Sequence, residues 1–387
     1  MRILQVAKYY SPSHGGMERV VRELSEGLAQ AGETVRVVAA SCGASPSVSL
    51  NNGVVIHRLK TWGTFLSQPL ISGLEREIEE FRPDVIHFHA PNPLALEVGW
   101  SRKIPKVVTL HAEPDGLKKY VHHALLRRRL RSAERIIFSS DEMARESVRQ
   151  NLVHDLTRAL VIPFGFRFNY LQALGREEEN DLLLFVGRLV KYKGLETLIE
   201  AMKRVRGRLA IVGDGPSRKS LEMMVNRFGL EDRIRFLGAL PDSDLAEWYE
   251  ACAVYVQPSI SSAEAFGISM MEAMHFGKPV ISTDLSTGVQ SVNRHLVSGL
   301  VVKRANSLAL SSAINSLLRD SRLRHDLGQG ALARVKLFTP ERMIQSHLDL
   351  YRSLLPMQDE PRALATDIRQ ESLLADADLG RDSELSR

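Results

Sequence analysis

The first 31 residues, MRILQVAKYYSPSHGGMERVVRELSEGLAQA (1–31), contain a pattern that recurs along the chain. Residues 3–7 form a short apolar run, typical of a strand buried on both faces of a parallel sheet. Residues 17–31 then show the periodicity of an amphipathic helix. Between them, Gly15 and Gly16 let the backbone approach a phosphate or a sugar closely, although such a pair alone is more often a plain tight turn. The stretch predicts a strand–loop–helix unit.

The same alternation continues through two halves of the chain. In the first half, further apolar runs predict strands at 34–40, 54–59, 85–88, 107–110, 135–138 and 159–162. A polar, acidic stretch at 175–181 reads as a linker, and the pattern starts again with strands predicted at 182–186, 209–212, 234–237, 254–257 and 279–282. This is an α/β chain with two Rossmann-like, doubly wound parallel sheets, whose intervening cleft is the default ligand site.

Domain boundaries follow from these patterns. We expect one domain over residues 1–170 and a second over 171–340, followed by a helix within 341–356 that returns to the first domain. Residues 357–387 are rich in Asp, Glu, Ser and Ala and contain no aromatic residue. That composition predicts a disordered tail.

Composition excludes several classes of protein. The only cysteines, Cys42 and Cys252, lie in separate halves, which excludes a disulfide framework and a cysteine metal site and favours a reducing cytoplasm. No signal pattern precedes the first strand, and no stretch approaches the roughly 20 apolar residues that span a bilayer. The net charge of +5 is mild. The basic residues of the chain gather in one short cluster, at 122–131, which has no Phe, Tyr or Trp side chains on which bases could stack. This disfavours nucleic-acid binding.

One segment carries the strongest functional signal: Glu264-Ala-Phe-Gly-Ile-Ser-Met-Met-Glu272. It places two carboxylates around the start of a helix predicted to begin near Gly267. The backbone N–H groups of Phe266, Gly267 and Ile268 would form a phosphate site at the helix N-terminus. Glu264 can face the same ligand, and Glu272 can reach a ribose hydroxyl. Taken alone, the spacing favours a capped helix with two solvated glutamates.

The flanking residues distinguish these readings. Together with Gln257-Pro-Ser259 and Ala273-Met-His-Phe-Gly-Lys-Pro-Val280, the segment resembles the Glu-x7-Glu signature of family 4 glycosyltransferases, which have the GT-B fold. Matching segments occur in the expected order at 10–16 (YSPSHGG), 81–87 (FRPDVIH), 185–194 (FVGRLVKYKG), 211–216 (IVGDGP) and 236–241 (FLGALP). Only residues 357–387 fall outside the resemblance.

The resemblance implies a retaining glycosyltransferase that uses an NDP-sugar. The first domain would lie on the acceptor side and the second would bind the donor. Arg188 and Lys193 follow the first strand of the second domain, where ligands bind in such sheets, and would hold the donor pyrophosphate. Gly187 and Gly213 belong to matching segments and would also line the donor site. Two basic side chains that neutralise the leaving group predict transfer without a metal or cofactor.

His111 and Glu264 are the further catalytic candidates. By resemblance, His111 sits beside the donor sugar and Glu264 near the sugar ring, while the departing phosphate helps to deprotonate the acceptor hydroxyl. On sequence alone, a structural histidine at a strand end is the favoured reading of His111. His87 and His89 are interpreted as packing or acceptor-side residues. Asp242-Ser-Asp244 is interpreted as a helix start with Asp242 as the N-cap, not as a metal-binding pair.

Two further expectations concern the acceptor. Residues 122–131 are basic and carry Leu125, Leu126 and Leu130, a pattern that fits a helix lying on an anionic membrane at the inner face of the cell membrane, or an ordinary solvated helix. The stretch 287–299 is similar to bacterial enzymes of polysaccharide and O-antigen assembly that use GDP-mannose-type donors. The expected acceptor is therefore lipid-linked or a glycan.

Two alternatives remain at this point. One is a nucleotide-sugar epimerase or phosphorylase on the same fold, and the other is a non-catalytic GT-B scaffold for a partner enzyme. The presence of Glu264, Glu272, Arg188 and Lys193 argues against both.

Overall fold

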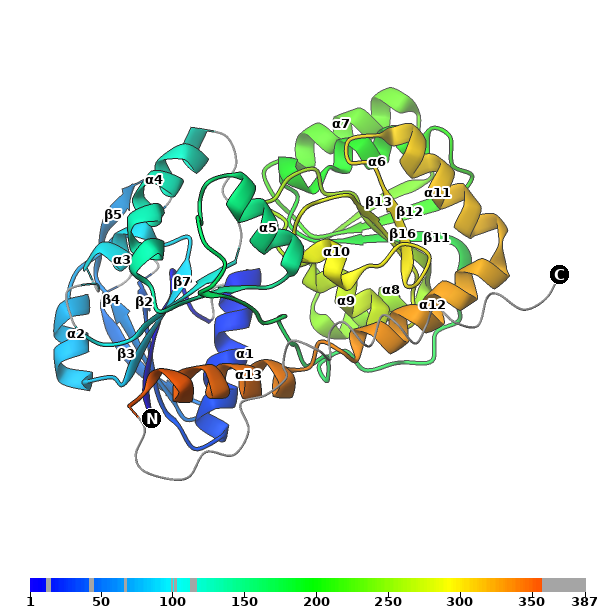
Figure 1. The fold of residues 1–387 in the computed structure, drawn as a ribbon. Coiled ribbons are helices and arrows are strands. Elements are labelled where there is room, and N and C mark those ends of the chain that lie inside the picture. Colours follow the sequence, from blue (N-terminus) through cyan, green and yellow to red (C-terminus); the bar gives the residue numbers. More distant parts are fainter. Residues whose placement is uncertain are drawn as a thin grey trace. The chain divides into compact units, whose positions relative to one another are not determined.

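The computed structural model describes residues 1–11, 15–41, 45–65, 68–98, 100, 103–111 and 117–356. Cys42 and the predicted disordered tail at 357–387 lie outside these residues. Residues Met1–Leu354 form one unit, in which Figure 1 shows two groups of strands, each flanked by helices. Cys252 is buried and forms no disulfide.

The first sheet has eight strands within the described residues, in the order β10-β9-β8-β7-β1-β2-β4-β3. All neighbours are parallel except β3 and β4. The strands are β1 (Arg2–Val6), β2 (Thr34–Ala40), β3 (Ser47–Asn51), β4 (Val54–Leu59), β7 (Val85–Ala90), β8 (Lys106–Leu110), β9 (Arg135–Phe138) and β10 (Ala159–Val161). The apolar runs therefore predicted every parallel strand of this sheet.

Four strands were not predicted. They are β3, the antiparallel pair β5 (Thr61–Phe65) and β6 (Gln68–Ile71), and β16 (Gly299–Val302) of the second sheet. β3 has the sequence SVSLN and is largely exposed, so it lacks the apolar run that marks a buried strand. Its pairing with β4 comes from the neighbouring strand and not from local hydrophobicity.

The second sheet contains six parallel strands in the order β13-β12-β11-β14-β15-β16. Counted within this half, the order is 3-2-1-4-5-6, that of a dinucleotide-binding Rossmann sheet. The strands are β11 (Glu179–Val186), β12 (Arg208–Val212), β13 (Ile234–Gly238), β14 (Cys252–Gln257), β15 (Val280–Thr283) and β16 (Gly299–Val302).

Each sheet has a point at which the strand order reverses. In the first sheet it lies between β1 and β7, and in the second between β11 and β14. Ligands of doubly wound folds bind outside the carboxyl ends of the strands at such points. Gly15 and Gly16 follow β1, Lys193 follows β11 and Glu264 follows β14. The topology thus places three groups of predicted site residues at the two switch points.

The helices include α1 (Gly16–Gln30), α2 (Leu74–Phe81), α3 (Pro93–Val98), α4 (Leu117–Ser132), α5 (Asp141–Arg149), α6 (Leu195–Met202), α7 (Arg218–Phe228), α8 (Asp242–Ala251), α9 (Ile268–His275), α10 (Gly288–Val292), α11 (Ser307–Arg319), α12 (Ser321–Val335) and α13 (Pro340–Leu354). Side-chain caps start several of them. Asn306, for example, accepts a hydrogen bond from the Ala309 N–H group at the start of α11. The predicted N-cap of α8 was wrong, because Pro241 takes that position and Asp242 is the first helical residue.

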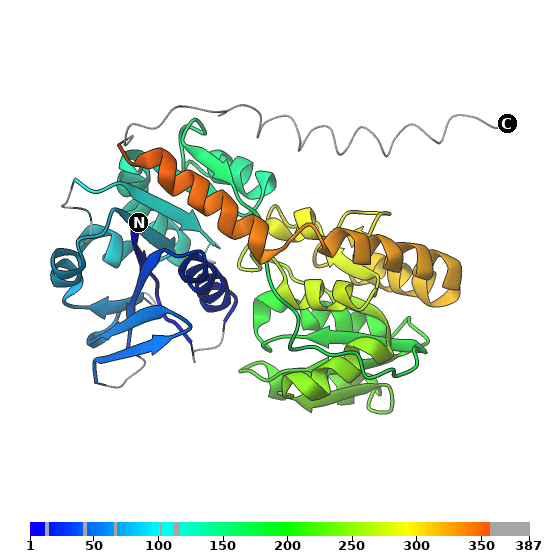
Figure 2. The same cartoon turned by 90° about the horizontal axis from the view of Figure 1, so that it is seen from below.

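Helix α13 packs against α1, and the two helices lie side by side in Figures 1 and 2. The Tyr351 hydroxyl on α13 lies 2.6 Å from Nδ1 of His87 in β7. The last described helix therefore contacts the core of the first sheet. Among the described residues, no helix combines the length and the apolar character that crossing a membrane requires.

Candidate active site

A cavity of about 410 Å³ lies at the two switch points. Its lining includes nine of the predicted site residues: Gly15, Gly16, His111, Lys193, Glu264, Phe266, Gly267, Ile268 and Glu272. Arg188, Gly187 and Gly213 are not among its lining residues. Most of the predicted constellation is therefore gathered around one cavity of ligand size.

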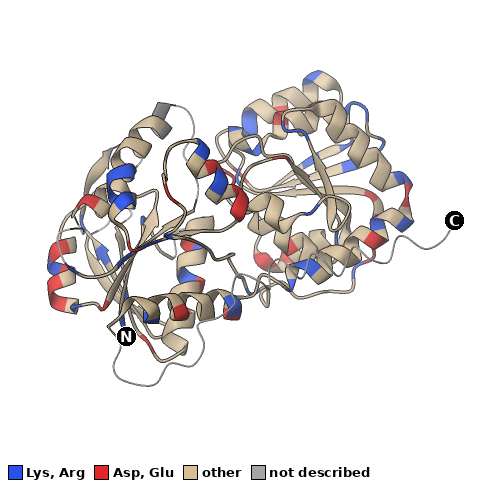
Figure 3. Cartoon of the chain, in the orientation of Figure 1, with Lys and Arg blue, Asp and Glu red and all other residues tan. Residues whose placement is uncertain are grey.

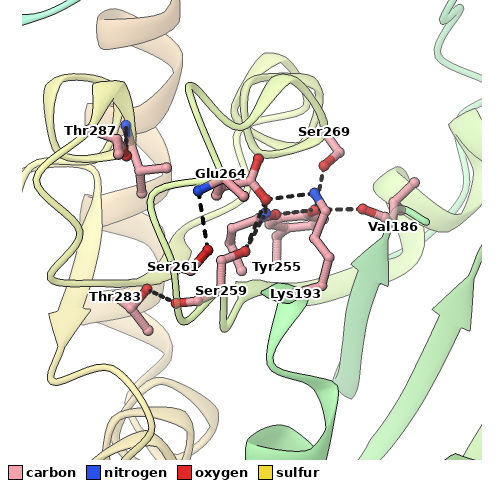
Figure 4. A network of polar contacts seen from close by, with 12 residues as sticks. Val186, Lys193, Tyr255, Ser259, Ser261, Glu264, Ser269, Thr283 and Thr287 are labelled. Carbon is pink, nitrogen blue, oxygen red and sulfur yellow. Dashed lines mark hydrogen bonds and ion pairs between the residues drawn. The ribbon is translucent and has the colours of Figure 1, made fainter. Parts of the chain in front are cut away.

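Lys193 and Glu264 form an ion pair beside this cavity. The Lys193 Nζ atom lies 2.6 Å from Oε2 of Glu264, and Figure 4 shows the two side chains pointing toward one another. The loops that carry them are held together locally. The Ile260 N–H group donates to the Tyr192 carbonyl oxygen at 2.8 Å, and a methyl group at Gly194 would lie 2.1 Å from the Pro258 carbonyl oxygen. Only glycine permits that close approach.

Two neutral side chains complete the setting of the Glu264 carboxylate. Gln257 Nε2 donates to Oε2 at 2.7 Å, and the Ser259 hydroxyl donates to the same oxygen at 2.9 Å. The Tyr255 hydroxyl lies 2.9 Å from Gln257 Oε1, which turns the amide nitrogen toward Glu264. Oε2 thus has three partners, whereas Oε1 has none among the described residues and is available to a ligand.

Lys193 keeps its charge in this buried position. Burial opposes the charged form, but the Glu264 carboxylate and then Tyr192 outweigh it, and the pKa of Lys193 is raised above its usual value. Both members of the pair are about nine-tenths buried. Removing one partner of such a pair leaves a buried charge uncompensated and costs about 3–5 kcal/mol.

The N-terminus of α9 provides backbone donors on the same cavity. Gly267 takes the cap position with a φ of 78°, in the left-handed region. The N–H groups of Phe266, Gly267 and Ile268 have no hydrogen-bond partner within the described part of the chain. An anion placed here would meet both these donors and the positive end of the helix dipole.

Glu272 lies on α9, and its carboxylate already has partners. Arg19 donates to Oε1 at 2.7 Å, Tyr170 donates to the same oxygen, and Tyr249 donates to Oε2 at 2.7 Å. The side chain lines the cavity but is held by residues from α1, the segment after β10, and α8. The sequence pattern predicted none of these three partners of Glu272.

His111 approaches the cavity from the end of β8. Its ring stacks on Phe164, with the ring centroids 5.1 Å apart. Burial, followed by the neighbouring His347, lowers the pKa of His111 to about 3, so the ring is neutral at physiological pH. His111 Nε2 lies 2.8 Å from Nδ1 of His89.

Comparison with known proteins assigns the family. Residues 166–334 match the family model described as glycosyl transferases group 1, and residues 14–167 match that of glycosyltransferase family 4. The chain is 31% identical over 371 residues to the O-antigen chain mannosyltransferase C of Escherichia coli, covering 92% of this chain and 99% of the relative. This chain belongs to the group 1, family 4 glycosyltransferases.

A second relative and a solved structure agree with this assignment. The D-rhamnosyltransferase WbpZ of Pseudomonas aeruginosa is 30% identical to this glycosyltransferase over 355 residues, covering 88% of this chain and 92% of the relative. The structure of sucrose-phosphate synthase from Thermosynechococcus elongatus superposes with a TM-score of 0.79 at 24% identity, covering 91% and 98% of the two chains. The latter likeness supports the GT-B fold alone.

Three predicted donor residues of the glycosyltransferase lie outside the cavity. Arg188 is exposed, and no described residue forms an ion pair with it. Gly187 stands next to the site, since a methyl group there would lie 3.5 Å from Lys193 Nζ. A methyl group at Gly213 would lie 2.0 Å from the Gly187 carbonyl oxygen, so Gly213 supports the loop that carries Gly187.

The basic segment of the glycosyltransferase at 122–131 differs from the expectation. Leu126 and Leu130 of α4 are buried in the core of the first sheet and are therefore not available to a bilayer. Arg129 pairs with Glu97, whereas Arg128 is exposed. The spacing of leucines suggested an apolar face for a membrane. Leu126 and Leu130 instead pack into the core, which leaves few apolar side chains on the outer face of α4.

Sequence reasoning also missed several residues of the site. Arg19 pairs with Glu272, and its guanidinium lies over the rings of Phe166, Phe168 and Tyr170 at 4.7 to 5.7 Å. The signal was present as aromatic residues at every second position from 164 to 170, which is the spacing of side chains on one face of an extended segment. Phe164 and Phe166 line the cavity.

Proposed function

We propose that this glycosyltransferase moves a hexose from an NDP-sugar to a hydroxyl of a lipid-linked or glycan acceptor, with retention of configuration and without a metal. The donor is of the GDP-mannose type, and the pathway is cell-surface polysaccharide assembly. The observation that carries this proposal is the Lys193–Glu264 pair beside the donor groups of the α9 N-terminus. This arrangement offers a cation, backbone donors and a carboxylate to one ligand.

The pyrophosphate would bind to Lys193 and the N-terminus of α9. Lys193 keeps its charge through Glu264, and the backbone N–H groups of residues 266–268 are oriented by the helix. Arg188, exposed on the loop after β11, would fold onto the phosphate from outside. Groups placed where negative charge develops on a leaving group contribute about 3–4 kcal/mol each to catalysis. Two cations and a helix end would take the place of a metal.

Retention is implied by the family resemblance, and the setting of Glu264 bears on the route by which it would occur. Oε2 of Glu264 accepts from Lys193, Gln257 and Ser259, which makes the carboxylate a poor nucleophile. We therefore favour substitution on one face of the sugar. The bond between the anomeric carbon and the phosphate oxygen breaks, the acceptor oxygen bonds to that carbon on the same side, and its proton passes to the departing phosphate. Oε1 of Glu264 would stabilise the positive charge that develops on the sugar ring.

The two relatives support the choice of donor and acceptor. One is named an O-antigen chain mannosyltransferase and the other a D-rhamnosyltransferase. Both names are consistent with a 6-carbon sugar as the transferred group, and the first points to a growing cell-surface glycan as acceptor. Mannose is the sugar that agrees with the first relative and with the similarity of residues 287–299.

Membrane contact would occur through the outer face of α4. Figure 3 shows basic residues along this helix, of which Arg128 is exposed. Tyr120 and Val121 of α4 are also exposed. An exposed cation on the same helix as an exposed aromatic and an exposed aliphatic side chain fits the interface of an anionic bilayer. These three exposed residues, and not the leucines expected from the sequence, would contact the membrane.

The test is product analysis with GDP-mannose and a lipid-linked glycan acceptor in the presence of a chelator. The proposal predicts one added mannose with the α-configuration of the donor, seen in the anomeric carbon–proton coupling. An inverted product, or transfer only after a divalent metal is added, would contradict it.

A further inference from the structure

A chain of buried polar side chains runs from the cavity through the first sheet to α13. His111 Nε2 lies 2.8 Å from His89 Nδ1, and His89 Nε2 lies 2.7 Å from Gln5 Oε1. Gln5 Nε2 lies 3.3 Å from the Tyr351 hydroxyl, which lies 2.6 Å from His87 Nδ1. His87 Nε2 ends the chain 2.7 Å from Thr109 Oγ1. All six side chains are buried.

The hydrogen bonds along this row of six side chains have one consistent direction of donation. A neutral imidazole has one donor and one acceptor nitrogen, so fixing one contact fixes all the others. The contact of 2.6 Å between Tyr351 and His87 suits an O–H donor, whereas that of 3.3 Å between Gln5 and Tyr351 suits an N–H donor. Tyr351 therefore donates to His87 and accepts from Gln5.

The remaining contacts follow from this assignment. Gln5 Oε1 must accept from His89 Nε2–H, because the Gln5 amide nitrogen faces Tyr351. His89 Nδ1 then accepts, and His111 Nε2 must carry the proton. His111 Nδ1 is left without a proton and has no partner among the described residues. His111 lines the cavity, and on this assignment Nδ1 is the ring nitrogen left to accept a hydrogen bond from a ligand.

We infer that Gln5 and Tyr351 are positioning residues that hold His111, through His89, as the tautomer whose bare Nδ1 accepts a hydrogen bond from a hydroxyl of the donor sugar. This role rests on the proposed function, and it concerns the sugar and not the nucleotide. Neither residue lies within the segments that match the family models, 14–167 and 166–334.

Burial supports the neutral state of every ring in the chain. It is the largest cause that lowers the pKa of His87 and His89 well below 6.5, and neighbouring histidines add to it. His347 stands beside His87, with the ring centroids 5.6 Å apart, and its Nδ1 lies 2.7 Å from the Met343 carbonyl oxygen, so it does not enter the chain.

The first experiment is long-range proton–nitrogen NMR on the full chain labelled with ¹⁵N in histidine. We expect His111 to carry its proton on Nε2 in the wild-type protein. Tyr351→Phe should release this preference and give a mixture of the two tautomers. Tyr10→Phe is the matched control, because the Tyr10 hydroxyl is also buried in the first half but has no hydrogen-bond partner among the described residues. A proton on His111 Nδ1 in the wild-type protein would overturn the inference.

The second experiment compares the binding of GDP-mannose with that of GDP. Tyr351→Phe should weaken binding of the sugar nucleotide by about fivefold, equivalent to one hydrogen bond, while GDP binding stays unchanged. Equal losses for both ligands would indicate a merely structural role and overturn the inference. If Tyr351→Phe does not fold, Gln5→Met interrupts the same chain from its other side. Failure of wild-type protein to bind either ligand would defeat the proposed function, and the NMR result would still decide the tautomer.

Discussion

The Nζ atom of Lys193 lies 2.6 Å from Oε2 of Glu264, joining the loop after β11 to the loop after β14. These strands flank the switch point of the second sheet, so the ion pair forms where a doubly wound fold binds its ligand. The pair holds a cation in a buried place, and it also occupies one oxygen of the carboxylate. Both effects determine what Lys193 and Glu264 offer to a sugar nucleotide.

Removing the Lys193 ammonium should abolish most of the activity. Lys193→Met should reduce turnover at least about 100-fold, because a positive charge next to the leaving phosphate is lost. The free energy of unfolding should fall by about 3 kcal/mol, since Glu264 then stays buried without a counter-charge. Initial rates and urea unfolding measure the two effects. Lys203→Met is the control, because Lys203 is more exposed and its ion-pair partner is Glu200 on α6, not a residue that lines the cavity. Activity near the wild-type level would refute the assignment of Lys193.

Replacing Arg188 should reduce turnover without changing the stability of the protein. The Arg188 side chain is exposed and has no ion-pair partner among the described residues, so Arg188→Ala should change the free energy of unfolding by less than about 0.5 kcal/mol. Turnover should nevertheless drop about 100-fold, because the donor phosphate loses a charged contact. Arg227→Ala on α7 provides an exposed arginine as control. Equal rates for the two variants would show that Arg188 does not bind the donor.

The buried histidines predict that acid destabilises the protein. The pKa of His111 is lowered to about 3 and that of His347 to about 4, mainly by burial, against an ordinary value of 6.5. As pH falls below 6.5, these histidines take up protons in the unfolded chain and stay neutral in the folded one. Stability should therefore fall by up to about 1.4 kcal/mol per pH unit for each such histidine.

Urea unfolding between pH 7 and pH 5 measures this slope. His347→Leu should make the slope shallower, because one proton-binding difference between the folded and unfolded chains is removed. His325→Gln, at an exposed position on α12, should leave the slope as it is. A stability that does not change over this pH range would contradict the prediction.

Membrane contact can be tested on α4. The double substitution Arg128→Glu and Tyr120→Ser should reduce co-sedimentation with vesicles that contain an anionic phospholipid, because it removes a cation and an exposed aromatic ring. Arg129 should be left intact, since its ion pair with Glu97 helps to hold α4 on α3. Arg227→Glu, on the second sheet's α7, is the matched charge control. If the double variant still binds as the wild-type protein does, α4 is not the docking face.

The fold and part of the site could be predicted from the sequence because local patterns determine them. All six residues of β7 and of β14 are buried, and such strands appear as apolar runs. The loops that follow strands at the switch points are likewise set by chain order. Lys193 and His111 were placed at strand ends in this way, whereas their roles and that of Glu264 were predicted from the resemblance to family 4 glycosyltransferases.

The rest of the site depends on contacts between distant parts of the chain. Arg19 and Glu272 are 253 positions apart, and His87 and Tyr351 are 264 positions apart. No local pattern shows that an arginine on α1 shares a carboxylate with two tyrosines, or that a helix near the C-terminus supports a histidine of the first sheet. These pairings come from packing, which determines which faces meet.

Binding of GDP-mannose measured by calorimetry, with a chelator present, tests the central claim most directly. We expect micromolar binding to the wild-type protein without metal, a loss of at least about tenfold in Lys193→Met, and unchanged affinity in Lys203→Met. UDP-glucose and UDP-GlcNAc, titrated in parallel, should bind more weakly. Absence of binding by all three sugar nucleotides, or equal binding by Lys193→Met and the wild-type protein, would contradict a donor site at the Lys193–Glu264 pair.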